Sequence, residues 1–152
     1  IVVVGFSTAV IETTTLVSIT QLEKYLDAEV DRARRYRRSV GLVMMRLDGS
    51  PDAVDRAIER IAGGLRRMDE LAEYGPDELA IVLPEANRAA CASAARRLAR
   101  EVLAADVRAF VGLASYPEHG ASAAELMSRG RAALRASCRI RCLLPARRGG
   151  PS

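Results

Sequence analysis

Cysteine and histidine side chains are the most chemically versatile groups in this chain, because thiolates and imidazoles bind zinc and act as nucleophiles or bases. The 152 residues include three cysteines, Cys91, Cys138 and Cys142, and one histidine, His119. Cys138 and Cys142 have a C-x3-C spacing, but no second ligand pair follows, and an odd number of cysteines does not make a disulfide framework. His119 has no visible acid–base partner and is interpreted as a loop residue. We therefore expect no metal, no cofactor, and reduced, buried thiols in a cytoplasmic protein.

The densest run of charge is basic, and its chemistry is anion binding. It contains Arg32, Arg34, Arg35, Arg37 and Arg38. Two interpretations stay open, a solvated helix end and a patch for phosphate or for a partner protein. Net charge is only +4 and aromatic residues make up 4% of the chain. No aromatic stripe interleaves with the arginines, so direct nucleic-acid binding is not expected.

Apolar spacing predicts the elements that must position these groups. Helical stripes are expected over residues 20–38, 51–68, 85–104 and 122–135, and strands over residues 40–47, 71–74, 78–83, 107–116 and 139–144. Two capping boxes, Thr20 to Glu23 and Ser122 to Glu125, and the pair Ser50-Pro51 are helix starts. Helices that alternate with strands in this way cover a single sheet.

Both ends of the chain differ from this pattern. Residues 1–15 hold two β-rich runs, interpreted as the end of a preceding β-rich domain or as a linker hairpin. Residues 145–152 are rich in Pro, Gly and Arg and are expected to form a flexible tail or linker. Residues 16–144 are then one domain. The first residue is Ile, which suggests a piece of a longer protein, and nothing near it is typical of a signal peptide or a membrane span.

The hairpin between the second and third strands is the most specific stretch. Residues 74–84 read YGPDELAIVLP. They resemble the signature hairpin of the GGDEF domains of diguanylate cyclases, which has a Gly-Gly-Asp/Glu-Glu-Phe tip and an apolar strand that ends in Leu-Pro. Four further segments agree with the family in order, at residues 29–36, 40–48, 110–117 and 126–135, so the resemblance covers residues 20–141. It implies an α/β (α+β) fold in which helices flank a mostly antiparallel sheet of about five strands.

The family condenses two GTP molecules into cyclic di-GMP, and the resemblance implies which residues would take part. In the family, carboxylates at the hairpin tip and at the end of the first strand hold Mg²⁺ against the triphosphate. Here the main metal position falls on Arg46, Asp48 remains, and the guanine-reading segment after the first strand is missing. The tip itself is degenerate and consists of Gly75, Pro76, Asp77, Glu78 and Leu79.

The tip keeps two carboxylates, and their presence has two interpretations. Asp77 and Glu78 are either a metal ligand with catalytic support, or a polar turn retained by descent. Arg46 opposes a divalent cation, and Pro76 fixes φ and removes an N–H donor where the chain must approach a ligand. We therefore expect no catalytic residues in this chain.

One ligand-binding feature of the family is retained, because Arg66 and Asp69 match the R-x-x-D inhibitory site that binds cyclic di-GMP in many GGDEF domains. The alternative is an Arg and an Asp that face solvent at a helix end.

The expected function is therefore that of a non-catalytic GGDEF-like regulatory or signalling domain in a larger bacterial protein, such as a transcription regulator. It would act on other domains of the parent protein or on a homodimer partner, away from membranes. The alternative is a cyclic di-GMP receptor that uses Arg66 and Asp69, and an active diguanylate cyclase is the least favoured interpretation.

Overall fold

The computed structural model describes residues 16–143, and the side chains of residues 16–139. Helices and strands follow one another as α1 Ile19–Tyr36, β1 Val40–Asp48, α2 Pro51–Gly63, β2 Glu70–Gly75, β3 Glu78–Pro84, α3 Arg88–Ala104, β4 Arg108–Tyr116 and α4 Ala123–Leu143. The hairpin predicted at residues 1–15 and the tail predicted at residues 145–152 lie outside the described residues. No helix in the described part of the chain is long and apolar enough to cross a membrane.

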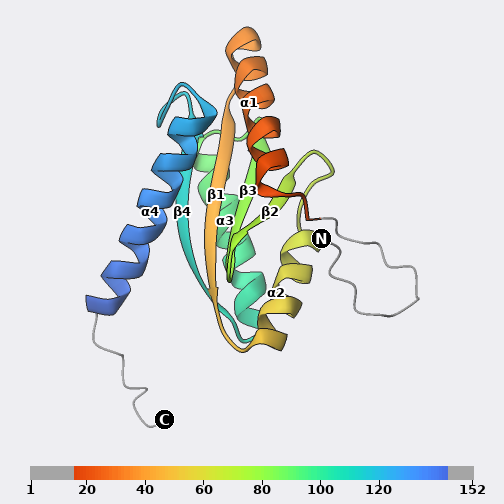
Figure 1. Cartoon of the computed structure of the whole chain (residues 1–152), viewed down its shortest axis with the longest axis vertical. Helices are drawn as coiled ribbons and strands as arrows, with labels where there is room; N and C mark the ends of the chain where they lie inside the picture. Colours follow the sequence, from red (N-terminus) through yellow and green to blue (C-terminus); the bar gives the residue numbers. More distant parts are fainter. Residues whose placement is uncertain (1–15, 144–152) are drawn as a thin grey trace.

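The sheet has four antiparallel strands in the order β2-β3-β1-β4 (Figure 1). This confirms a mostly antiparallel sheet flanked by helices. The fifth strand predicted at residues 139–144 is wrong, because Arg139 to Leu143 continue helix α4. Residues 131–144 contain neither Gly nor Pro, and their Ala, Arg and Leu residues favour continued helix.

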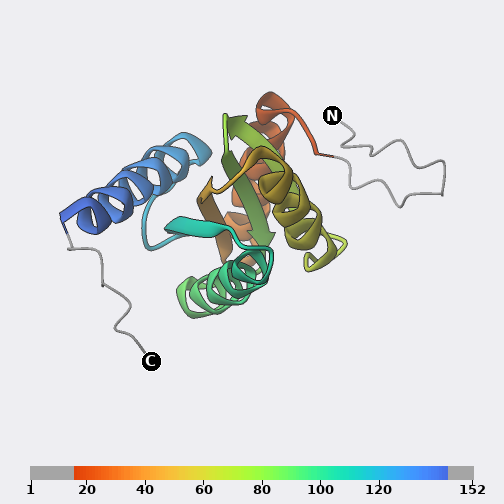
Figure 2. The same cartoon turned by 90° about the horizontal axis from the view of Figure 1, so that it is seen from below.

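Helices cover both faces of the sheet, as Figure 2 shows. Alternate residues of β1 point to opposite faces. Val43 and Met45 pack in the cluster that contains α2 and α3, whereas Leu42 and Met44 pack in the cluster that contains α1 and α4. All four side chains are fully buried. This double burial explains why β1 reads as a continuous apolar run.

The predicted start of α2 is confirmed, and two other predicted starts are displaced. The Ser50 hydroxyl accepts the Ala53 N–H, and Pro51 opens α2. Helix α1 begins earlier than predicted, because its capping box is formed by Ser18 and Gln21. Helix α3 begins later, at Arg88, because Glu85 takes a left-handed conformation with φ of 59°. Helix α2 also ends early, at Gly63, where glycine lowers helix propensity.

Helix α4 lies directly against β4 because two glycines remove side chains from the contact. A Cβ at Gly112 would lie 2.3 Å from the Leu134 amide nitrogen and 2.4 Å from the Gly130 carbonyl oxygen. Gly130 in turn faces Met44 of β1, whose Cγ would lie 2.9 Å from an added Cβ. This close approach fixes the position of α4 on the sheet, and with it the position of the α4 side chains near the hairpin.

Candidate functional site

The tip of the β2–β3 hairpin is held against β1 by a backbone hydrogen bond. The Leu47 N–H donates to the Asp77 carbonyl oxygen at 2.7 Å. Asp77 adopts a left-handed φ of 59°, a conformation that Asp tolerates better than most residues. Pro76 and Asp77 are exposed, and Glu78 is half-buried. The tip is therefore a rigid turn that presents two carboxylates beside the end of β1.

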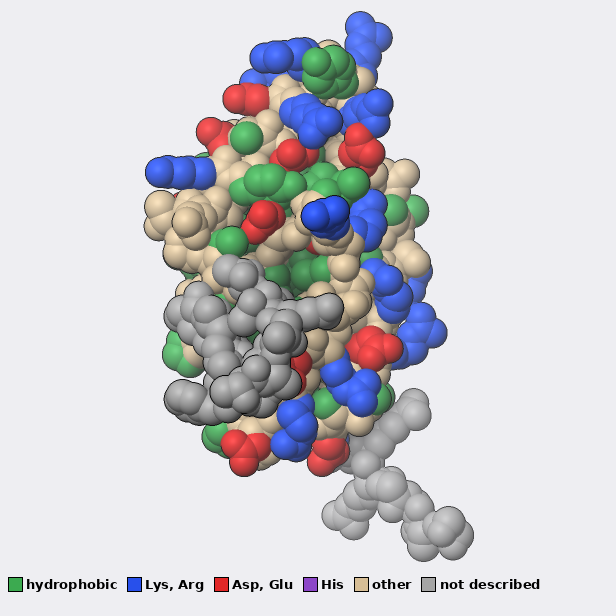
Figure 3. All heavy atoms as spheres, turned by 90° about the vertical axis from the view of Figure 1, so that its right-hand side faces the viewer, with side chains coloured by type: hydrophobic (Ala, Val, Ile, Leu, Met, Phe, Trp, Pro, Cys, Tyr) green, Lys and Arg blue, Asp and Glu red, His purple; other side chains and the backbone are tan. Residues whose placement is uncertain are grey.

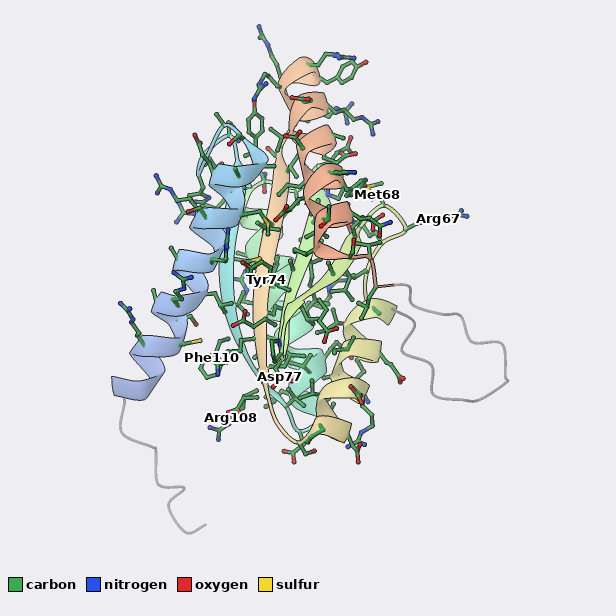
Figure 4. All side chains as sticks on the ribbon, in the orientation of Figure 1. Arg67, Met68, Tyr74, Asp77, Arg108 and Phe110 are labelled. Atoms are coloured by element: carbon green, nitrogen blue, oxygen red, sulfur yellow. The ribbon has the colours of Figure 1, made fainter. Side chains whose placement is uncertain are left out.

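The register of the sheet places a basic residue opposite two of the carboxylates at this end. Arg46 of β1 lies opposite Glu78 of β3, and Asp48 lies opposite Arg108 of β4. Residues two apart on a strand share a face, so these groups alternate in sign over one surface. Figure 4 shows Asp77 of the tip in the same region as Arg108 and Phe110 of β4. The structure thus places Arg46 and Asp48 at the end of β1, beside the hairpin tip.

A third arginine approaches the tip from α4. Nη1 of Arg131 donates to the Tyr74 hydroxyl at 2.5 Å, and its guanidinium carbon lies 5.2 Å from the centre of the Tyr74 ring. Tyr74 precedes the tip residue Gly75. This contact leaves no local signal in the sequence, because Arg131 and Tyr74 are 57 positions apart and only the packing of α4 joins them.

The residues at this end do not fit a Mg²⁺ site. Such a site needs several oxygen ligands whose negative charge compensates the cation. Here guanidinium groups lie opposite Glu78 and Asp48 in the sheet register. Within residues 16–143, no three His, Cys, Asp or Glu side chains are grouped closely enough to hold a metal ion.

Arg66 and Asp69 form a tight turn at the opposite end of β2, between α2 and β2. Asp69 Oδ2 accepts the Arg66 backbone N–H at 2.6 Å, and Oδ1 accepts from Nη2 of Arg66 at 3.1 Å. Nη2 also donates to the Pro84 carbonyl oxygen at 2.9 Å. The Asp69 side chain is only 1% exposed, whereas that of Arg66 is 51% exposed. The alternative of a solvent-facing pair at a helix end is therefore wrong for Asp69.

The same turn is tied to α1, because the Tyr25 hydroxyl donates to the Met68 carbonyl oxygen at 2.6 Å. Burial raises the pKa of Tyr25, and the neighbouring carboxylates of Glu29, Glu70 and Asp69 raise it further. Burial also raises the pKa of Glu70, the first residue of β2. Figure 4 shows Arg67 pointing away from the protein at this loop.

A hollow of about 410 Å³ opens beside Arg66, between the turn and helix α3. Arg97 and Ser93 of α3 line it together with Arg66 and Asp69. Glu85, which pairs with Arg38, also lines the hollow. The two arginines come from separate elements and offer guanidinium donors to an anionic group. Arg97 was not predicted, because its place beside Arg66 depends on how α3 packs and leaves no local signal in the sequence.

The cysteines and the histidine lie in the core, on helix α4 or in a loop, and the structure gives partners for two of them. Cys91 is buried, its thiol lies 3.7 Å from the Leu42 carbonyl oxygen, and burial raises its pKa to about 11. Cys138 is half-buried on α4, and the Cys142 side chain lies outside the described residues. His119 is in a loop, as predicted, but it has partners, because its Nδ1 accepts the Ser115 N–H at 2.9 Å.

The basic run lies at the end of α1 and in the turn that follows. Three of its arginines form ion pairs, Arg32 with Glu29, Arg34 with Asp31 and Arg38 with Glu85. Their side chains are 57–65% exposed, which agrees with a solvated helix end.

Solved structures with similar folds are GGDEF domains. A sensory box/GGDEF family protein from Caulobacter crescentus has a TM-score of 0.70 at 24% identity, covering 82% of this chain and 94% of that chain. The GGDEF domain of DgcB from Caulobacter crescentus, in complex with c-di-GMP, has a TM-score of 0.71 at 19% identity, covering 88% and 92%. Diguanylate cyclase SiaD from Pseudomonas aeruginosa, in complex with its activator SiaC, has a TM-score of 0.70 at 23% identity, covering 82% and 56%.

No protein-family model and no curated protein sequence matches the chain. The structural likeness confirms that the chain has the fold of GGDEF domains.

Proposed function

We propose that this chain is a non-catalytic GGDEF-like regulatory domain of a larger bacterial signalling protein, and that it acts through protein interaction or dimerisation. The observation that carries the proposal is the place of Arg46, at the end of β1 and opposite Glu78 of the hairpin tip. A guanidinium there repels the divalent cation that phosphoryl chemistry on GTP needs. Strands β1, β3 and β4 remain paired up to this end, so the domain keeps surfaces through which other domains can be bound.

Turnover of GTP tests this proposal. The chain is incubated with GTP and Mg²⁺, and the products are separated by chromatography beside those of a competent diguanylate cyclase. We expect no cyclic di-GMP. Formation of cyclic di-GMP that is lost in Glu78→Gln would overturn the proposal, because it would show that the tip carboxylate supports chemistry.

A second candidate function, a receptor for cyclic di-GMP, is favoured by the hollow beside Arg66. Both Asp69 oxygens are already occupied by Arg66 and the carboxylate is buried, so it is not available to a guanine edge. Nε and Nη2 of Arg66 are engaged by Asp69 and Pro84, so Arg66 can offer its Nη1 donors to phosphate and Arg97 its guanidinium, as charge-assisted hydrogen bonds.

Calorimetric titration with cyclic di-GMP decides this candidate. Arg66→Ala and Arg97→Ala should each weaken binding about tenfold or more, because each removes a charge-assisted hydrogen bond. Arg67→Ala is the matched control, since this neighbouring side chain points away from the protein (Figure 4). Absence of heat, or equal effects of Arg66→Ala and Arg67→Ala, would rule the receptor out.

A further inference from the structure

Strands β2 and β4 form the two edges of the sheet (Figures 1 and 2), and the β2 edge is protected. Val17 adds an isolated parallel bridge to Ala72 of β2, and the pairing of β2 with β3 shifts register between Glu73 and Gly75. Figure 3, which views the molecule from the β2 side, shows acidic and basic side chains spread over this surface. Covering segments, bulges and charges are devices that keep an edge strand from pairing with another chain.

Strand β4, by contrast, is regular and apolar over its whole length. Its nine residues pair with β1 from Arg108 opposite Asp48 to Tyr116 opposite Val40, without a register shift. The sequence of β4 contains no proline, and no charged residue follows Arg108 within the strand. Long, regular and apolar edge strands are templates to which a further strand can be added.

The backbone groups of β4 that point away from β1 can be assigned from Ser115. Its N–H donates to Nδ1 of His119 at 2.9 Å, and its carbonyl oxygen accepts the His119 N–H at 2.8 Å, so both groups of Ser115 point outward. Because the direction of the backbone groups alternates along a strand, Ala109, Val111 and Leu113 also point outward. Within residues 16–143, no other segment pairs with these three residues on that side.

Helix α3 lies along this edge, and its level relative to β4 is fixed through Cys91. An added Cβ at Gly41 would lie 3.0 Å from the Cys91 sulfur, and Gly41 pairs with Ser115 of β4. Only residues 105–107 separate α3 from β4, so the two elements run in opposite directions. With rises of about 1.5 Å per helix residue and about 3.3 Å per strand residue, five residues along α3 correspond to about two residues back along β4. Arg96 is therefore level with Leu113.

One flank of α3 faces α2, and the other lies beside the β4 edge. Glu101 marks the α2 flank because it pairs with Arg60, and α2 lies toward the β3 side of the sheet (Figure 2). Arg96 and Leu103 are roughly half a turn round the helix from Glu101. Both are exposed, Leu103 by 63%. This wall therefore presents a cation level with Leu113 and an apolar side chain toward the start of β4.

The charge of Arg96 is available to a partner. Among the described residues, no ion pair includes Arg96 or Arg88. Both arginines line a hollow of about 520 Å³ together with Glu118 of the loop after β4. Glu118 accepts the Ser115 hydroxyl at 3.0 Å and is the acidic residue of this lining. Two guanidinium groups thus face one carboxylate, so the hollow favours a further acidic side chain.

Helix α4 forms the opposite wall of the β4 edge and leaves room for small side chains there. An added Cβ at Gly112 would lie 2.3 Å from the Leu134 amide nitrogen, so α4 is close to the strand. Arg131 marks the flank of α4 that faces Tyr74. Ala133 lies roughly half a turn round the helix from Arg131, on the flank toward the β4 edge. A strand beside β4 therefore needs small residues where it faces α4.

We propose that the outer edge of β4 binds an extended segment of a partner protein as a fifth strand, antiparallel to β4. The residue of that segment opposite Leu113 is acidic and pairs with Arg96. The residue opposite Ala109 is apolar and packs on Leu103. Strand β4 of a second copy does not fit, because its own α4 would enter the space that α4 occupies here. This inference rests on the proposed function, action through protein interaction, and names the surface and the chemistry of the partner.

Amide hydrogen exchange and peptide titration, both followed by NMR at low ionic strength, test the proposal. In the free chain, the outward amides of Val111 and Leu113 should exchange faster than those of Gly112 and Ala114, which pair with β1. The probe is the peptide acetyl-TESVSLT-amide, whose glutamate and leucine then lie opposite Leu113 and Ala109. Titration to about 5 mM peptide detects dissociation constants of about 1 mM. The peptide should shift the outward amide signals and slow their exchange.

Two pairs of variants identify the edge and the charge. Val111→Pro removes an outward N–H but leaves the pairing with β1, and should abolish binding, whereas the control Val111→Thr keeps the N–H and should bind. R96E should weaken binding about fivefold, because it replaces attraction by repulsion. The peptide acetyl-TKSVSLT-amide should in turn bind R96E more tightly than the parent chain. The matched control is R56E, the same charge reversal at an exposed position of α2.

Circular dichroism checks the fold of each variant, and the charge exchange between R96E and the lysine peptide decides the matter if Val111→Pro does not fold. Slow exchange of Val111 and Leu113 in the free chain would overturn the proposal, because another part of the chain or a second copy would already cover the edge. Absence of peptide-induced shifts, binding that persists in folded Val111→Pro, or equal effects of R96E and R56E would also overturn it. GTP turnover is measured separately, so failure of peptide binding contradicts only this inference, and cyclic di-GMP formation contradicts only the absence of catalysis.

Discussion

The two ends of strand β2 differ in how their charged side chains are paired. At the hairpin end, Arg46 and Arg108 lie opposite carboxylates in the sheet register, so cations and anions alternate over one surface. At the other end, Asp69 is buried under Arg66, while Arg66 and Arg97 face an open hollow. Arginine opposite a carboxylate compensates its negative charge and weakens its attraction for a metal ion. A half-exposed arginine, by contrast, keeps N–H donors for an anion. The comparison therefore separates an end where carboxylates face arginines from an end where two arginines face an open hollow.

The hairpin end depends on the close contact of α4, which the other end does not use. Gly112→Ala places a Cβ 2.3 Å from a backbone nitrogen of α4, which a rotamer change cannot relieve. We expect a loss of about 3 kcal/mol in the free energy of unfolding, measured by urea titration. Gly63→Ala is the control, since nothing lies within 4 Å of its added Cβ. Equal stability of Gly112→Ala and the parent chain would show that α4 is not seated as described.

Removal of a carboxylate should matter at one end of β2 and not at the other. Asp69→Ala removes a buried carboxylate that accepts hydrogen bonds from the Arg66 backbone and guanidinium, and should cost about 2 kcal/mol. Glu78→Gln at the half-buried tip should change stability by less than about 0.5 kcal/mol. Thermal unfolding of both variants measures the difference. A larger loss of stability for Glu78→Gln than for Asp69→Ala would reverse the comparison, because the tip carboxylate would then contribute more to folding than the buried Asp69.

The contact between Arg131 and Tyr74 fixes the hairpin end to α4. Tyr74→Phe removes the hydroxyl acceptor but keeps the ring beside the guanidinium, and should cost about 1 kcal/mol in unfolding free energy. Tyr36→Phe, at a side chain that is 60% exposed, is the control and should have no measurable effect. If both substitutions behave alike, the contact does not stabilise the tip.

Glu70 gives the smallest expected effect, and its sign can be worked out. Burial raises the pKa of Glu70 in the folded chain above the ordinary 4.5, so the folded state holds this proton more tightly than the unfolded state does. Stability contributed by Glu70 is therefore present at acidic pH and is lost as the pH rises above 4.5. The stability of the parent chain relative to Glu70→Gln should fall slightly between mildly acidic and neutral pH. A relative stability that rises with pH would contradict the burial of the Glu70 side chain at the start of β2.

Local chemistry explains which parts of the fold could be predicted. Ser50 and Pro51 mark the start of α2 without help from the rest of the chain, and the β2–β3 hairpin is recognisable from its Gly-Pro-Asp tip. The capping box of α1 was predicted two residues late because two overlapping patterns fit. The capping box that forms, at Ser18 and Gln21, lies next to a tertiary contact. The Val17 N–H, just before Ser18, donates to the Leu71 carbonyl oxygen of β2.

The candidate site was predictable only where its residues are close in sequence. Arg66 and Asp69, or Gly75 to Leu79, form short motifs that carry their own signal. Arg97 and Arg131 join these motifs from helices far along the chain, and their roles depend on which turn of each helix faces the sheet. The absent fifth strand has a similar cause, because residues 139–144 have an apolar pattern that suits either a strand or a helix, and the continuity of α4 decides between them.

Binding of a divalent metal with GTP at the hairpin end tests the central claim most directly. Mn²⁺ is titrated into the chain with GTP and followed by electron paramagnetic resonance, in the parent chain and in Glu78→Gln. The account predicts that the parent chain adds no bound metal beyond that held by GTP alone, and that the two chains give the same titration curve. Saturable metal binding in the parent chain that Glu78→Gln abolishes would contradict it, because a working metal–nucleotide site would then exist despite Arg46.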